Sequence, residues 1–145
     1  MPRRELIFRF PASLQYLTAV RQAVHAFCVD VLESEEFEEQ VYQVQLAVSE
    51  LATNIIRHAY RDRETGTVEM RGQGDGTVVT LDFFDTGKAY DPKTPRLPDL
   101  EHLAEGGYGS FIIQQSVDRV AYSRDRADER NHWRLEKRFV GKRGA

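Results

Sequence analysis

Residues 50–60 read ELATNIIRHAY, a stretch that places a carboxylate and a carboxamide on one side of an expected helix. Side chains four positions apart project next to each other from a helix, so Glu50 and Asn54 are expected to be neighbours. The Asn54 carbonyl oxygen suits Mg²⁺, and Glu50 could act as a general base toward a hydroxyl or water that attacks a phosphate. The same spacing is common on solvated helix faces, which is the alternative interpretation.

The helix is expected to run to about Tyr60, because its apolar residues recur at helical spacing on a separate face. Arg57 falls on the polar side with Glu50 and Asn54. His58 lies between the two sides, where a structural role is expected. The apolar stripe consists of Val41, Val44, Val48, Leu51, Ile55 and Ala59.

A second motif, DTGKAYDP at residues 85–92, follows an apolar stretch that reads as a strand. The Asp85 carboxylate could accept a hydrogen bond from an adenine amino group. Gly87 has no Cβ and would let the backbone approach the base closely. A simple strand-ending turn is the alternative, because Asp and Gly are common turn residues.

The third motif is EGGYG at residues 105–109, just before an expected helix over residues 110–116. Backbone N–H groups at a helix start can hold a phosphate, although a flexible loop leading into a helix is the alternative. The motif has neither the glycine spacing of a dinucleotide-binding fingerprint nor the Gly-Lys-Ser/Thr of a Walker A loop. The order of the three motifs points to a nucleotide site, which needs a base reader, a metal ligand and a phosphate cradle.

The composition is that of one soluble globular domain over residues 1–145, with 41% hydrophobic and 30% charged residues. The net charge of −3 argues against nucleic-acid binding by charge alone. The chain has no stretch of transmembrane length and no apolar signal-peptide region, so a cytoplasmic protein without membrane contact is expected. Cys28 is the only cysteine and is expected to pack as a small apolar residue. The histidines lack zinc-site spacing, and a serine-hydrolase elbow is missing from the sequence.

Along the chain, alternation and helical periodicity predict strand, two helices, two strands, a long loop, a helix and two strands. The acidic segment Ser34–Glu39 is expected to cap and begin the second helix. This order predicts an α+β two-layer sandwich, in which helices cover one face of a mixed, mainly antiparallel sheet. The expected strands are residues 4–10, 67–72, 77–84, 118–123 and 131–140.

Together the three motifs resemble the N-box, G1 box and G2 box of the GHKL ATPase superfamily, which includes gyrase, histidine kinases and MutL. Within it, the chain is most similar to the anti-sigma-factor serine kinases of the RsbW/SpoIIAB type. The pointers are SELATNIIRHAY, DTGKAYDP, GGYGSFIIQQSVDRVAY and the final NHWRLEKRF. The resemblance covers nearly the whole chain, from Arg4 to Val140.

The resemblance implies a Bergerat-type ATP-binding fold that uses ATP and Mg²⁺. Asn54 would ligate Mg²⁺, Glu50 would be the catalytic base, and Asp85 would read adenine with Gly87 beside it. A lid would span about residues 88–109, and its final Gly107, Tyr108 and Gly109 would lie at the phosphates. Members of the family phosphorylate a serine or threonine of a small STAS-domain anti-anti-sigma protein and sequester a sigma factor, usually as homodimers.

Two residues depart from the family pattern. Ala89 stands where a glycine or proline is frequent, and Tyr108 stands where a smaller or basic residue is frequent. Because Glu50, Asn54 and Asp85 are all present, a competent site is expected. Three alternatives stay open: a nucleotide-gated binding switch without kinase activity, the ATP-binding domain of a histidine kinase, and a regulator whose target is not a sigma factor. A histidine-kinase domain is less favoured, because the sequence shows no helical hairpin with a phosphoacceptor histidine.

Overall fold

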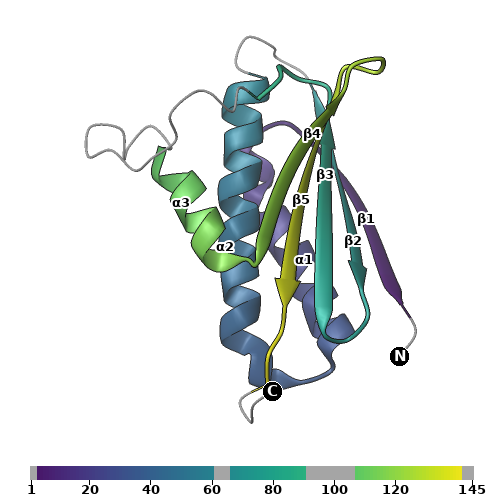
Figure 1. Ribbon diagram of the computed structural model, residues 1–145, viewed down its shortest axis with the longest axis vertical. Helices are drawn as coiled ribbons and strands as arrows, with labels where there is room; N and C mark the ends of the chain where they lie inside the picture. Colours follow the sequence, from purple (N-terminus) through teal and green to yellow (C-terminus); the bar gives the residue numbers. More distant parts are fainter. Residues whose placement is uncertain (1–2, 61–65, 91–106, 142–145) are drawn as a thin grey trace.

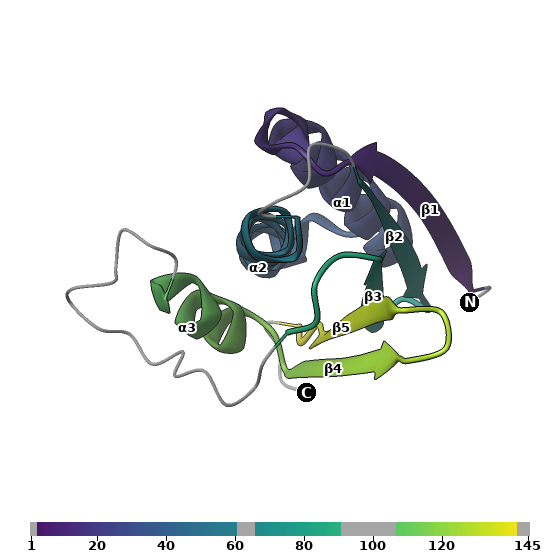
Figure 2. The same cartoon turned by 90° about the horizontal axis from the view of Figure 1, so that it is seen from above.

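The computed structural model describes residues 3–60, 66–90 and 107–141. These residues form one five-stranded sheet with three α-helices packed on one of its faces (Figures 1 and 2). Seen from above, α1, α2 and α3 all lie on the same side of the sheet (Figure 2). The expected two-layer α+β sandwich is therefore confirmed.

The sheet has the strand order β1-β2-β3-β5-β4, and all four pairings between the described strands are antiparallel. The expectation of a mixed sheet is thus wrong for the described part of the chain, where no parallel pair occurs. The strands β3 and β5 lie side by side, so that Asp85 pairs with Asn131. The strand bounds are β1 Arg4–Pro11, β2 Thr67–Gly74, β3 Val78–Asp85, β4 Arg119–Asp125 and β5 Arg130–Arg138.

The first helical layer is built from α1 (Leu17–Leu32) and α2 (Glu38–Asn54). The short 3-10 turns η1 (Leu14–Tyr16) and η2 (Glu35–Phe37) precede them. The helix α1 ends where Glu33 adopts a left-handed conformation, with φ of 52°, and donates its N–H to the Val29 carbonyl. Ser34 caps the following turn by accepting the Glu36 N–H, as expected for this acidic segment.

The second half of the ELATNIIRHAY stretch is not α-helical. The helix α2 ends at Asn54 and continues as a π-helical turn, η3, over Ile55–Ala59. The prediction of one regular helix to Tyr60 is therefore wrong at its last turn. Apolar spacing alone did not reveal the change, because Ile55 and Ala59 are buried in the π turn as they would be in an α turn.

The helix α3 runs over Gly107–Ser116, three residues earlier than expected. Gly107, Tyr108 and Gly109 therefore form its first turn and are not a glycine loop in front of it. Most of the predicted lid, residues 91–106, lies outside the described residues. Figure 1 shows the start of α3 near the C-terminal half of α2, and the two helices pack together.

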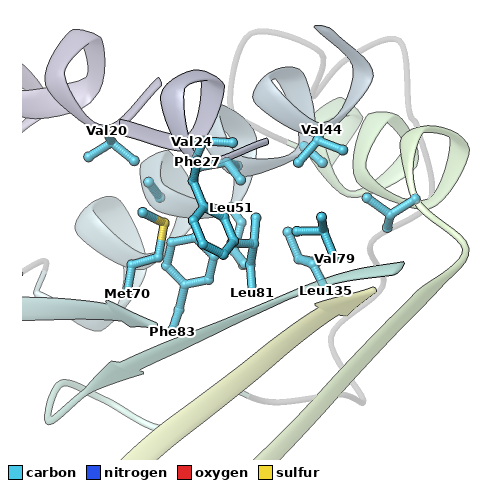
Figure 3. Packing of buried hydrophobic residues seen from close by; sticks show 14 of the residues in the cluster. Val20, Val24, Phe27, Val44, Leu51, Met70, Val79, Leu81, Phe83 and Leu135 are labelled. Carbon is cyan, nitrogen blue, oxygen red and sulfur yellow. The ribbon is translucent and has the colours of Figure 1, made fainter. Parts of the chain in front are cut away.

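The core lies between the helices and the sheet. Inward side chains of α1 and α2 meet inward side chains of β2, β3 and β5 (Figure 3). Cys28 is among them and is buried, and burial raises the pKa of its thiol to about 12. The thiol is therefore a packing group, as predicted. The residues labelled in the close-up are Val20, Val24, Phe27, Val44, Leu51, Met70, Val79, Leu81, Phe83 and Leu135.

The sheet face away from the helices, called the outer face here, carries charged side chains in ion pairs. Glu69 accepts hydrogen bonds from Arg9, which lies opposite it on β1, and from Arg71, two residues further along β2. Asp82 contacts Arg134 at 2.7 Å and His132 at 2.6 Å. Among the described residues, none of the helices combines the length and hydropathy needed to span a bilayer.

Candidate functional site

A cavity of about 120 Å³ lies where the end of α2 and the π turn face α3 and the neighbouring strands. Both polar and apolar side chains line it, which is the usual character of a small-molecule site. The described wall consists of Leu51, Asn54, Ile55, His58, Ala59, Asp85, Lys88, Ala89, Tyr90, Ile113, Gln114, Val120, Asn131 and Trp133.

The two halves of the first motif occupy different places. Asn54, the last residue of α2, lines the cavity, and its side chain is half-buried. Its amide has no hydrogen-bond partner within the described ranges, so its carbonyl oxygen is available to a cation. Glu50 lies one turn earlier, is half-buried and does not form part of the described cavity wall. His58 is exposed and lines the cavity, and the structural role expected of it stays a prediction.

Asp85, at the end of β3, is the buried carboxylate of the cavity. The residue is 2% exposed. Its Oδ1 accepts hydrogen bonds from the Gly87 N–H at 2.9 Å and from Asn131 Nδ2 at 2.8 Å. Its Oδ2 is buried and has no hydrogen-bond partner in the described part of the chain. A buried acceptor without a donor is unfavourable, so this atom fits a ligand that brings an N–H group.

The electrostatics of Asp85 agree with that geometry. Burial raises the pKa of its carboxyl above the usual value of 3.8, and the hydrogen bonds from Asn131 and Gly87 and the charge of Arg124 oppose this rise. Among the described residues, the carboxylate is therefore held by neutral donors and no cationic side chain contacts it. Perturbed carboxyl groups in clefts are typical of functional sites.

Gly87 is required by a close approach to the π turn, and its place beside a bound base stays a prediction. A Cβ at this position would lie 2.4 Å from the Ala59 carbonyl oxygen. The neighbouring Lys88 N–H donates to the same carbonyl at 2.8 Å. Gly87 therefore lets the chain after β3 pass directly against the π turn, which brings Asp85 and Asn54 to one cavity.

The segment after β3, residues 86–90, is fixed by hydrogen bonds to elements on both sides. On the helix side, Tyr60 Oη accepts the Thr86 N–H at 3.0 Å, in addition to the Ala59–Lys88 bond. On the strand side, Tyr122 Oη accepts the Tyr90 N–H at 3.0 Å. This segment would be the start of the predicted lid, and its backbone is well anchored.

Asn131 belongs to the site although no sequence motif pointed to it. Asn131 begins the inward side of β5, is 1% exposed, and touches Asp85 and the Lys88 carbonyl. A polar residue at an inward position of an alternating strand was the signal that could have revealed it. Its partners Tyr122 and Arg124, both on β4, were also missed.

An aromatic group closes the strand side of the site. The rings of Tyr90 and Trp133 lie 4.9 Å apart, and those of Tyr122 and Trp133 lie 4.7 Å apart. Trp133 and Tyr90 line the cavity, as do the apolar Ile113 and Val120. Flat apolar surfaces next to a single buried carboxylate suit an aromatic heterocycle that carries an amino group.

The phosphate end of the predicted site is described only through its backbone. Gly107–Gly109 form the first turn of α3, where the N–H groups have no partner within the helix. Such a turn can hold an anionic phosphate. Ala89, one of the two departures from the family pattern, lines the cavity, and so it lies against any ligand there.

The family model of the histidine kinase-like ATPase domain matches residues 10–137 of the chain. The chain belongs to this family. The matched region includes Asn54, Asp85, the first turn of α3 and Asn131, and so it contains every described element of the cavity.

Curated relatives of this ATPase-domain chain carry the name Serine-protein kinase RsbW. The protein of Oceanobacillus iheyensis is 32% identical over 91 residues, which are 57% of this chain and 57% of the relative. The protein of Bacillus licheniformis is 27% identical over 123 residues, 76% of this chain and 72% of the relative. That of Staphylococcus epidermidis is 25% identical over 121 residues, 77% and 74% respectively.

Proposed function

We propose that this chain is an ATP-dependent protein serine/threonine kinase that also acts as an anti-sigma factor in a partner-switching system. Its phosphoacceptor would be a STAS-domain anti-anti-sigma protein, and its other partner a sigma factor. The observation that carries the proposal is the buried Asp85 Oδ2, which lacks a donor and lies in the wall of a cavity that also holds Asn54. The relatives named as serine-protein kinases supply the choice of reaction.

The proposed binding of ATP follows from the chemistry of the cavity wall. The adenine amino group would donate to Asp85 Oδ2, and the ring would lie among Trp133, Tyr90 and the apolar residues. The phosphates would extend toward the first turn of α3, where backbone N–H groups and the positive end of the helix dipole favour anions. Bound Mg²⁺ would neutralise phosphate charge, with the Asn54 carbonyl oxygen as a ligand.

The proposed transfer step assigns Glu50 as general base. Its carboxylate would take the proton from the acceptor serine or threonine hydroxyl as the hydroxyl oxygen bonds to the γ-phosphorus. The bond between the γ-phosphorus and the bridging oxygen breaks, and ADP leaves with that oxygen. Glu50 lies outside the described base cavity, which agrees with a role at the phosphate end and not at the base end.

Phosphotransfer tests this proposal. The protein is mixed with labelled ATP, Mg²⁺ and STAS-domain proteins from the same genome. We expect label on a serine or threonine of one of them, and we expect Glu50→Gln to abolish the label without weakening ATP binding. Glu39→Gln is the matched control, because it makes the same change on an exposed residue of the same helix, three turns away.

Other outcomes separate the alternatives. A nucleotide-dependent complex without label would make the chain a binding switch that is not a kinase. Label on a protein outside sigma-factor control would retain the kinase and change the target. Loss of both ATP binding and label in Glu50→Gln would overturn the role given to Glu50. The expected homodimer is tested separately by the mass of the protein in solution.

A further inference from the structure

Behind Asp85 lies a group of polar side chains that the proposed function does not use. Asn131 faces Asp85 across the β3–β5 pair and is buried. One hydrogen of its amide goes to Asp85 Oδ1 at 2.8 Å, and the other goes to the Lys88 carbonyl at 2.9 Å. Asn131 therefore connects the carboxylate to the backbone segment that follows it.

The contacts on the other side of Asn131 determine which way its amide points. The two ends of an Asn amide look alike, so their identity has to be assigned from the partners. Arg124, which can only donate, lies 2.8 Å from the Oδ1 end. Tyr122 Oη already accepts the Tyr90 N–H, and its own proton is directed to the same Oδ1. Because two donors contact this end of the Asn131 amide, this end must be the oxygen. The NH₂ end must therefore face Asp85.

This orientation has a consequence for the carboxylate. Asp85 Oδ1 receives two donors, Asn131 Nδ2 and the Gly87 N–H, which hold the carboxylate in one position. Oδ2 is then the acceptor that remains for a ligand. Tyr122 and Arg124 take part in this arrangement although neither belongs to the described cavity wall.

We propose that Asn131, oriented by Tyr122 and Arg124, is a positioning residue that sets the preference of the site for a base with an exocyclic amino group. Asn131 also lines the cavity, but its two amide hydrogens are already donated to Asp85 and to the Lys88 carbonyl, so it acts through Asp85. The inference rests on the adenine binding in the proposed function, but it does not depend on phosphotransfer.

A pair of nucleotides measures how much the amino group contributes to binding. ATP and purine riboside triphosphate differ only in that the second has hydrogen in place of the amino group. Calorimetry gives the affinity for each, and their ratio reports the hydrogen bond to Asp85. For the unaltered protein we expect ATP to bind roughly tenfold to hundredfold more tightly, as for a hydrogen bond to a charged group.

The variants are Asn131→Ala and Tyr122→Phe. We expect Asn131→Ala to bring the ratio close to one while the affinity for purine riboside triphosphate stays within about twofold. Tyr122→Phe removes one oxygen outside the cavity, and we expect the ratio to fall roughly threefold to fivefold. Asn131→Ala also moves the pH at which half the ATP affinity is lost to a higher value, because a donor to the ionised Asp85 is gone.

Val79→Ala serves as the control for destabilisation alone, since Val79 is in the core and outside the described cavity wall. It should lower the melting temperature and leave the ratio unchanged. If Asn131→Ala does not fold, Tyr122→Phe carries the test. Equal loss of affinity for both nucleotides in Asn131→Ala or Tyr122→Phe, with an unchanged ratio, would give the network a structural role only and overturn the inference.

The same measurements separate a failure of this inference from a failure of the proposed function. If the unaltered protein does not distinguish the two nucleotides, adenine recognition by Asp85 is wrong, and the inference is wrong with it. If the ratio behaves as expected but no protein is phosphorylated, the kinase proposal fails and the inference stands.

Discussion

Asp82 and Asp85 are buried carboxylates three positions apart on the same strand, and they have opposite surroundings. Asp82 points to the outer face of the sheet, where Arg134 and His132 contact it. Asp85 points toward the helices, where neutral donors hold one oxygen and the other has no donor in the described part of the chain. The first carboxylate is satisfied by the fold, and the second keeps one buried acceptor that no described residue satisfies. The difference indicates which of the two similar residues can offer an acceptor to a ligand.

The largest effect is expected from replacing the Asp85 carboxylate with an amide. Asp85→Asn should weaken ATP binding about 100-fold, because an NH₂ group would face the adenine amino group. In metal-free buffer, Asn54→Ala should weaken binding far less, because its role is to hold the metal. Calorimetry on both variants measures this difference, and equal losses without metal would contradict the division between base reading and metal binding.

A second effect concerns a donor to Asp85. Gly87→Ala would force a Cβ against the Ala59 carbonyl and displace the Gly87 N–H from Asp85, so we expect a loss of about 2 to 3 kcal/mol in unfolding free energy. Gly141→Ala is the control, since its Cβ would meet only the carboxyl end of the exposed, flexible Glu36 side chain. Urea denaturation measures both. A loss for Gly87→Ala no larger than that for Gly141→Ala would show that the backbone at residue 87 gives way.

Asp82→Asn tests whether the other carboxylate affects only stability. It should lower the unfolding free energy by about 1 to 2 kcal/mol, because Arg134 and His132 lose a charged partner but keep access to water. ATP affinity should stay within about twofold of the unaltered value. A loss of nucleotide affinity as large as that of Asp85→Asn would end the distinction between a structural and a functional carboxylate.

The smallest effect is on pH dependence, and its two parts have opposite signs. Burial raises the pKa of Asp85 in the folded protein above 3.8, so the folded state holds this proton more tightly than the unfolded chain. Without nucleotide, the contribution of Asp85 to stability is therefore present at low pH and is lost as the pH rises through the raised pKa. ATP affinity, which needs the ionised carboxylate, should instead fall as the pH is lowered through the same range.

The control for this pH effect is Asp85→Asn, which should remove both slopes. Thermal melting and calorimetry over the same series of pH values provide the two readouts. If stability and ATP affinity both rise with pH, the ionised form of Asp85 is favoured in the nucleotide-free folded protein. That result would contradict the raised pKa.

The sequence predicted the architecture well because alternation and helical spacing are local signals. It also brought Asn54 and Asp85 to one site, although their roles remain predictions. The chain after β3 was harder to interpret. The spacing did not reveal that Gly87 lies directly against the π turn at Ala59, while its place beside a base stays a prediction. Such contacts join residues that are far apart in the sequence, so the spacing of residues along the chain does not predict them.

Other differences have their own physical reasons. The sequence places the start of α3 at Ser110 because glycines favour turns, but the helix begins at Gly107 and includes both glycines in its first turn. Asn131 was missed because its importance depends on the pairing of β3 with β5, which brings it opposite Asp85. The DTGKAYDP motif could be recognised in the sequence, whereas Asn131, which contacts it from β5, could not.

The π-helical turn at Ile55–Ala59 has a consequence for how length changes are tolerated here. A π turn closes over one more residue than an α turn, so it can be regarded as an α-helix with a single residue inserted. Deleting one residue between Asn54 and Tyr60 would restore regular α geometry and turn the Ala59 carbonyl away from Lys88. A related sequence that lacks one residue here would therefore be expected to lose the bond between the Ala59 carbonyl and the Lys88 N–H. The segment after Asp85 would then be held differently, even if all three motifs were present.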